Sequence, residues 1–153
     1  MAYTHEQFGS DVAQKFEFLE SSHGLRRHAL HAEGAGAWII YENADVKVTV
    51  EYEIGGSCGV SVQNVRHVNR DPLERNEFDL EEIVALSGGK PRREEPRSMP
   101  EAVSRAAQML QSAGSSVLKG DFVALHARQA RAAETIRRNN AAMDLTLETV
   151  KPE

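Results

Sequence analysis

The chain has 153 residues, of which 41% are hydrophobic and 27% charged, and its formal net charge is −5. This length and composition are typical of one soluble globular domain with a hydrophobic core. An acidic chain repels phosphate backbones, so general nucleic-acid binding is not expected, whereas a basic protein partner suits the charge. The first 55 residues hold nine acidic against four basic residues, so the acidity is concentrated there.

The sequence also excludes several classes of site. A single cysteine, Cys58, cannot form an internal disulfide or a zinc site built from several cysteines. No apolar run approaches the roughly 20 residues that cross a bilayer. The first residues lack the basic and then apolar pattern of a secretory signal. We therefore expect a cytoplasmic protein with no membrane partner.

The first expected element is a helix over residues 5–21. Thr4 and Gln7 have the spacing of a capping box, in which each side chain bonds to the backbone amide of the other residue. Gly24 follows as a helix end. Apolar side chains recur between them at helical spacing, at Phe8, Val12, Phe16 and Leu19.

Residues 25–33 are compatible with a short helix or with an edge strand. We favour the strand, because residues 34–36 can then form a hairpin into the apolar segment 38–41. Charged side chains are also what an edge strand uses to discourage unwanted pairing. The sheet would then have four strands.

The segment 36–65 predicts the centre of the fold, an antiparallel meander of three strands. Between residues 46 and 53, apolar and polar side chains alternate strictly, which indicates a strand with one buried and one solvated face. Turn-forming residues at 43–45 and 55–57 bracket this strand. The inward set is Val46, Val48, Val50 and Tyr52, and the outward set is Lys47, Thr49, Glu51 and Glu53.

The second half of the chain predicts helices. Asp79 can cap a short helix over residues 80–86, and Ser98 can cap another that ends at Gly114. A last helix begins near residue 121 and carries an apolar stripe as far as Ile136. We expect the last two helices to form an antiparallel pair. Residues 88–100 are expected to be a mobile charged loop, and residues 144–153 a short strand or a frayed tail.

These elements together predict a single α+β domain. Its antiparallel β-meander of three or four strands would pack its apolar face against the N-terminal helix and the C-terminal helix pair.

Six histidines raise the question of a metal site, chiefly at His23, His28 and His31. On a strand, His28 and His31 point to opposite faces, whereas on a helix they share one. No nearby carboxylate or cysteine completes a zinc set of the usual type. We therefore expect solvated histidines and no bound metal or other cofactor.

No residue pattern indicates a catalytic site. Cys58 lies at the entry to a strand and is interpreted as a small, half-buried thiol. Neither a Gly-x-Ser-x-Gly motif nor a phosphate-binding glycine loop is present. Glu51 and Glu53 would lie roughly 7 Å apart on a strand, but a solvated face explains them more simply.

The order of features resembles small, acidic, uncharacterised bacterial proteins of the immunity type, which accompany toxins. The residues that carry this resemblance are Phe-Glu-Phe-Leu in the first helix, the Val-x-Val-x-Val-x-Tyr strand, Asp-Leu-Glu-Glu-Ile, and Leu-Lys-Gly-Asp-Phe before the last helix. The resemblance covers most of the chain as a pattern and assigns no functional residue.

The function expected from the sequence is protein binding without catalysis, in its most concrete form the occlusion of a basic toxin domain by an immunity protein. A dimeric secretion-type chaperone and a small enzyme with an unrecognised site are the alternatives, and a homodimer is compatible with the sequence. The candidate contacts are two sets, the acidic residues Asp45, Glu51 and Glu53, and the helical arginines Arg128, Arg131 and Arg138.

Overall fold

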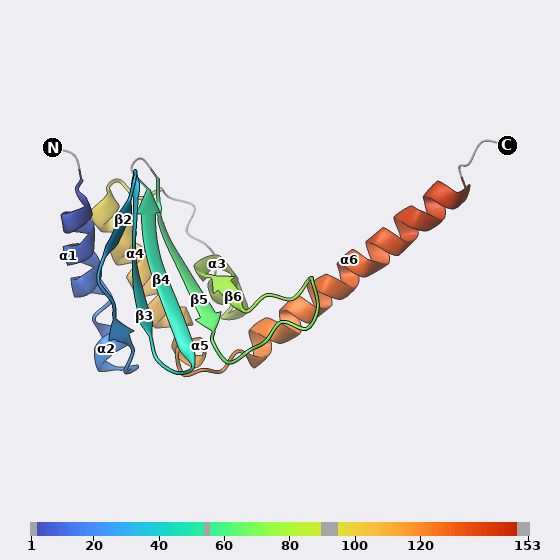
Figure 1. Ribbon diagram of the computed structural model, residues 1–153, viewed down its shortest axis with the longest axis horizontal. Helices are drawn as coiled ribbons and strands as arrows, with labels where there is room; N and C mark the ends of the chain where they lie inside the picture. The colour runs from blue at the N-terminus through green and yellow to red at the C-terminus, as the bar shows by residue number, and fades with distance from the viewer. Residues whose placement is uncertain (1–2, 54–55, 90–94, 150–153) are drawn as a thin grey trace.

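The chain folds as an antiparallel sheet with helices packed on one of its two faces, as seen in the computed structural model (Figure 1). The structure describes residues 3–53, 56–89 and 95–149, with side chains up to residue 144 in the last helix. The α+β class and the antiparallel sheet are confirmed. The described residues form six strands, more than the three or four expected.

The strands lie in the order β1–β3–β4–β5–β6, and β2 pairs with the same edge of β3 as β1. Every pair is antiparallel. The strands are β1 (Arg26–Arg27), β2 (His31–Glu33), β3 (Gly36–Glu42), β4 (Val46–Glu53), β5 (Cys58–Asn64) and β6 (Glu77–Asp79). The three central strands are the predicted meander, and β6 is an addition that sequence periodicity did not indicate.

The faces of β4 are those predicted from its alternation. Val46, Val48 and Val50 are fully buried and Tyr52 is 3% exposed. The β3–β4 hairpin is closed by Asn43, whose Oδ1 accepts hydrogen bonds of 2.8 Å from the backbone amides of Asp45 and Val46. A side chain that bonds its own backbone in this way replaces part of a backbone turn.

Residues 25–33 are extended, as favoured from the sequence, but they form two short strands instead of one. The interruption at residues 28–30 does not detach the segment, because the His28 amide donates a 2.8 Å bond to the Ile40 carbonyl. The two short strands together cover the edge of β3, and all their residues are exposed.

The helix expected over residues 5–21 is divided into α1 (His5–Lys15) and α2 (Phe18–Ser21). Its predicted capping box is formed, with hydrogen bonds of 3.1 and 2.8 Å between Thr4 and Gln7. The break near Phe16 has a packing reason. Phe16 and Phe18 would point about 200° apart on one continuous helix, yet both are buried.

The remaining helices are α3 (Leu80–Leu86), α4 (Met99–Ala113), α5 (Ser115–Leu118) and α6 (Val123–Thr149). The predicted caps of two of them are formed, since the Asp79 side chain accepts from the Glu82 amide and the Ser98 side chain accepts from the Glu101 amide. In Figure 1, α1 lies to the left of the strands and α4 lies behind them, and both helices pack on the apolar face of the sheet.

The expected antiparallel pair of C-terminal helices is not formed. Helix α4 packs on the sheet. Helix α6 contacts α3 and then extends away from the rest of the molecule (Figure 1). The apolar stripe of α6 is too short to pack the whole helix against the domain. Phe122 and Leu125 are buried, but Ile136 is 45% exposed and Met143 63% exposed.

Two expectations concern segments that the structure describes only in part. Within the loop expected at 88–100, residues 90–94 lie outside the described residues. Helix α6 continues to Thr149, so residues 144–149 do not form the strand that we had considered, and residues 150–153 lie outside the described part.

Candidate functional sites: an open sheet face and a histidine cluster

The face of the sheet that points away from α1 and α4 is open. Along β3 and β4, the outward side chains are partly or fully exposed, in strict alternation with the buried ones. Figure 1 shows this face toward the viewer, with none of the labelled helices crossing in front of β3 and β4. The outward set predicted for β4 therefore lies on an accessible surface.

The strand register gathers acidic side chains around Trp38 at one end of this face. Glu51 lies directly opposite Trp38, and Glu53 lies opposite Gly36. On the other side of β3, Glu33 of β2 is also opposite Gly36. Residues opposite each other on neighbouring strands point to the same face. We call Trp38, Glu33, Glu51 and Glu53 the acidic end.

Two glycines leave room at the acidic end. A methyl group added to Gly59 would come within 3.3 Å of the Glu51 side chain, so Glu51 lies across the bare backbone of β5. Gly36 likewise leaves β3 bare opposite Glu53. A shallow hollow of about 630 Å³ results, and Glu33, Trp38, Glu51 and Glu53 are among the residues that line it.

Trp38 is partly exposed and is held in place by His31 of β2. The two rings stack with their centroids 5.4 Å apart and their planes 6° from parallel. A half-buried tryptophan whose ring is already fixed loses little conformational freedom when it is covered, which is a property of residues that dominate protein interfaces.

The charges of the open face are unevenly distributed. Among the residues that the structure describes, no ion pair involves Glu33, Glu51 or Glu53. At the opposite end of the face, Glu42 lies 2.8 Å from the His28 ring and is opposite both Arg26 and Lys47. Among the described residues, negative charge without an ion-pair partner is therefore found at the acidic end, and also on Glu77 and Asp79 of β6, which are exposed on the same face.

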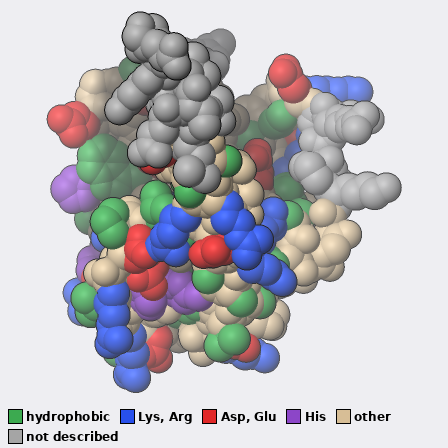
Figure 2. Space-filling view, turned by 90° about the vertical axis from the view of Figure 1, so that its right-hand side faces the viewer, with side chains coloured by type: hydrophobic (Ala, Val, Ile, Leu, Met, Phe, Trp, Pro, Cys, Tyr) green, Lys and Arg blue, Asp and Glu red, His purple; other side chains and the backbone are tan. Residues whose placement is uncertain are grey.

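The structure does not bring the other predicted contact residues to the acidic end. Asp45 lies in the β3–β4 turn, at the other end of β4, and forms an ion pair with Arg66. The arginines at 128, 131 and 138 are exposed along α6, where Arg138 pairs with Glu134 at 3.2 Å. Figure 2, seen from the α6 side, shows basic and acidic side chains intermixed there.

Cys58 has none of the features of an activated nucleophile. Its side chain is half-buried, opposite Tyr52 of β4. Burial raises the pKa of the Cys58 thiol to about 12, with a smaller contribution from the negative charge of Glu51. The thiol is therefore protonated at neutral pH, and its thiolate, which is the reactive form, is scarce.

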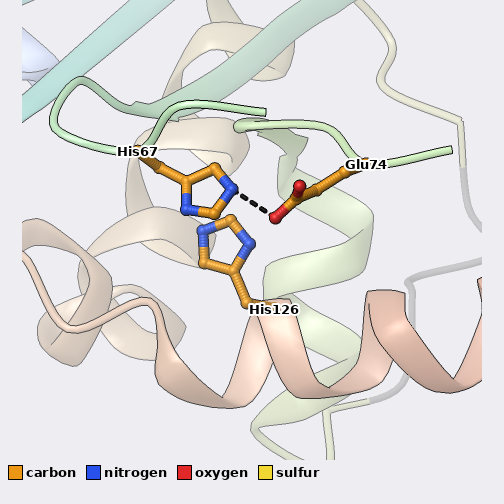
Figure 3. Close-up of side chains that lie close together, drawn as sticks. All are labelled: His67, Glu74 and His126. Carbon is orange, nitrogen blue, oxygen red and sulfur yellow. Dashed lines mark hydrogen bonds and ion pairs between the residues drawn. The ribbon is translucent and has the colours of Figure 1, made fainter. Parts of the chain in front are cut away.

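The histidines that we considered from the sequence do not meet. His23 lies edge-on to Phe18, His28 pairs with Glu42, and His31 stacks on Trp38. A different pair does meet: His67, from the segment between β5 and β6, stacks on His126 in the first turns of α6. Their ring centroids are 4.1 Å apart, and Glu74 lies beside them (Figure 3).

Sequence reasoning missed this histidine cluster, defined by His67, Glu74 and His126, because no local spacing links His126 to the other two residues. The only local signal was the interval of seven residues between His67 and Glu74 in a polar segment. Their proximity to His126 follows from the position of α6 in the fold, and sequence periodicity does not predict that position.

No protein-family model, curated protein or solved structure matches the chain significantly.

Within the described part of the chain, no helix has both the length and the apolar character needed to cross a lipid bilayer.

Proposed function

We propose that the chain is a non-enzymatic protein that binds another protein through the open face of its sheet, with the acidic end as the centre of contact. The observation that carries this proposal is the position of Trp38, a partly exposed tryptophan bordered by the carboxylates of Glu33, Glu51 and Glu53, which form no ion pair with any described residue. Aromatic side chains of this kind supply most of the energy in many protein interfaces.

The charge of the acidic end selects a basic partner. Exposed carboxylates on a chain of net charge −5 attract a positively charged surface and accelerate its encounter with the acidic end. Close contact would then cover the Trp38 ring and bury apolar area that remains partly exposed in the free protein.

The most concrete form of this proposal is an immunity protein that neutralises a basic toxin domain by covering its functional surface. Such a role needs no catalytic group on this chain, and its mechanism is occlusion. The acidic open face and the resemblance of the sequence pattern to immunity-type proteins support this form of the proposal.

Affinity capture from extract of the native cells tests the proposal, if it is carried out with matched bait proteins. The informative baits are Trp38→Ala and the double variant Glu51→Gln/Glu53→Gln. The control is Glu6→Gln/Glu17→Gln, which removes the same amount of charge from exposed positions outside the open face. Quantitative mass spectrometry compares the proteins that each bait retains.

The proposal predicts a basic protein that is retained by the wild type and by the control, and that is strongly depleted with both variants of the acidic end. If no retained protein depends on Trp38 and on the Glu51–Glu53 pair, the proposal is contradicted. If a protein is lost equally with the control bait, general charge attraction explains its capture and the acidic end is not its site.

A dimeric secretion-type chaperone is the second candidate, and one observation favours it. Ile136 and Met143 are exposed seven residues apart, on one side of the part of α6 that extends from the molecule. A second copy of the chain could cover them. Sedimentation equilibrium tests this candidate. If the wild type is a dimer and the Ile136→Ser variant is a monomer, the chaperone is supported, whereas a monomeric wild type argues against it.

A further inference from the structure

The histidine cluster joins two segments that are far apart in the sequence. His67 and Glu74 belong to the segment between β5 and β6, and His126 belongs to the beginning of α6. Their side chains converge from opposite sides on one point (Figure 3). The potential metal-ligating atoms of the three residues all lie within 4.8 Å of one another.

The carboxylate of Glu74 is held in place by both of its oxygens. Oε2 accepts a 2.8 Å hydrogen bond from the Arg70 amide, and Oε1 lies 2.5 Å from His67 Nε2. The bond from the Arg70 amide is the main cause that lowers the pKa of Glu74, to which the His67 ring also contributes. The group is therefore a carboxylate at neutral pH, hydrogen-bonded to an imidazole nitrogen.

Both nitrogens of His126 have an amide side chain beside them. Nε2 lies 3.1 Å from the Asn64 amide nitrogen, and Nδ1 lies 3.3 Å from the Gln129 amide oxygen. A metal-ligating histidine usually gives its other N–H to an acceptor, which fixes the ring and its tautomer. The Gln129 oxygen is such an acceptor for Nδ1, so Nε2 would be the ligating nitrogen, and the Asn64 amide would turn away from it. The Gln129 amide nitrogen is buried and has no hydrogen-bond partner within the described part of the chain.

The cluster is partly shielded from water. The His67 and Glu74 side chains each keep 25% of their surface exposed. Phe78 lies edge-on to the His126 ring at 5.2 Å, and Phe122 lies 6.3 Å away. The cluster therefore lies between an apolar wall and solvent.

We propose that His67, Glu74 and His126 bind a divalent transition-metal ion of the Zn²⁺ type. Two imidazoles and one carboxylate form a ligand set that zinc uses, with a fourth position left for water. Ligand atoms about 2.0 Å from a tetrahedral ion are roughly 3.3 Å apart. The present separations, from 2.5 Å between His67 and Glu74 up to at most 4.8 Å, lie on both sides of that value, so the side chains would reorient around the ion.

The ion would link the segment between β5 and β6 to the base of α6. Only a few apolar side chains hold this end of α6, and a single further ion pair, between Asp71 and Arg137, joins the same two segments among the described residues. A metal bound in the folded state alone stabilises that state by mass action. The site is therefore a structural brace and needs no part in partner binding at the acidic end.

Calorimetric titration of the chelator-treated full chain with Zn²⁺ tests the proposal. The test variants are His126→Ala and Glu74→Gln, the second of which keeps the size of the side chain but removes its charge. The control is His28→Ala, because His28 is also a histidine beside a carboxylate, at the edge of the sheet. Circular dichroism confirms that each variant is folded.

We expect one equivalent of Zn²⁺ to bind the wild type and the control with the same affinity. Each test variant should weaken binding by at least about tenfold, the effect that loss of even a supporting residue can have. Zn²⁺ should also raise the melting temperature of the wild type but not of His126→Ala. Absence of stoichiometric binding to the wild type, or unchanged binding to both test variants, would overturn the proposal.

Discussion

Trp38 of β3 and Glu51 of β4 lie directly opposite each other on neighbouring strands, and both side chains are on the open face of the sheet. This pairing places an apolar ring beside a carboxylate that lies over Gly59, where no side chain competes for the space. The strand register therefore determines which residues meet at the acidic end.

The buried face of β4 can be tested by comparing two neighbouring residues. Val48 is fully buried, so Val48→Ala should lower the free energy of unfolding by about 1–2 kcal/mol through lost burial and a small cavity. Thr49 points to the open face, so Thr49→Ala should cost less. Urea denaturation measures both, and a cost for Thr49→Ala equal to or larger than that for Val48→Ala would contradict this assignment of the two faces.

The thiol of Cys58 should react slowly with alkylating reagents. A pKa of about 12 in place of 9.0 reduces the thiolate at pH 8 by roughly a thousandfold. Iodoacetamide should therefore modify the folded chain far more slowly than the urea-unfolded chain, and the rate should still rise with pH above 9. Equal rates for the folded and unfolded chains at pH 8 would show an accessible, ordinary thiol.

Gly59 should matter for binding more than for folding. A methyl group at this position would lie 3.3 Å from the flexible Glu51 side chain. Gly59→Ala should therefore push this side chain away from β5 while the backbone pairing of the sheet remains intact. We expect a small change in melting temperature and a reduced affinity for the partner. A large loss of stability with unchanged affinity would place the role of Gly59 in packing alone.

The parts of the fold that were predicted correctly depend on local patterns. The alternation in residues 46–53 is complete within one strand, and the caps at Thr4, Asp79 and Ser98 involve residues three positions apart. Such signals are readable without knowledge of the tertiary structure. The position of α6 is not, because it depends on how few apolar residues remain to hold the helix beyond Ala133.

The candidate sites divide in the same way. Glu51 and Glu53 were predicted as outward neighbours because they lie two residues apart on one strand. Their grouping with Trp38 and Glu33 depends on pairing between strands, which the sequence does not state. The histidine cluster depends on contact between two segments that are far apart in the sequence. Glu74 and His126 are separated by 52 residues, and no local pattern connects them.

The kinetics of binding to the captured partner test the acidic end most directly. Surface plasmon resonance would compare Glu51→Gln/Glu53→Gln with Glu6→Gln/Glu17→Gln at ionic strengths of about 0.01 M and about 0.1 M, between which the screening length falls from about 30 Å to about 10 Å. If the acidic end steers the partner, its neutralised variant should associate more slowly than the control at the lower ionic strength, with a smaller difference at the higher. Equal association rates for the two variants at both ionic strengths would contradict the proposed binding site.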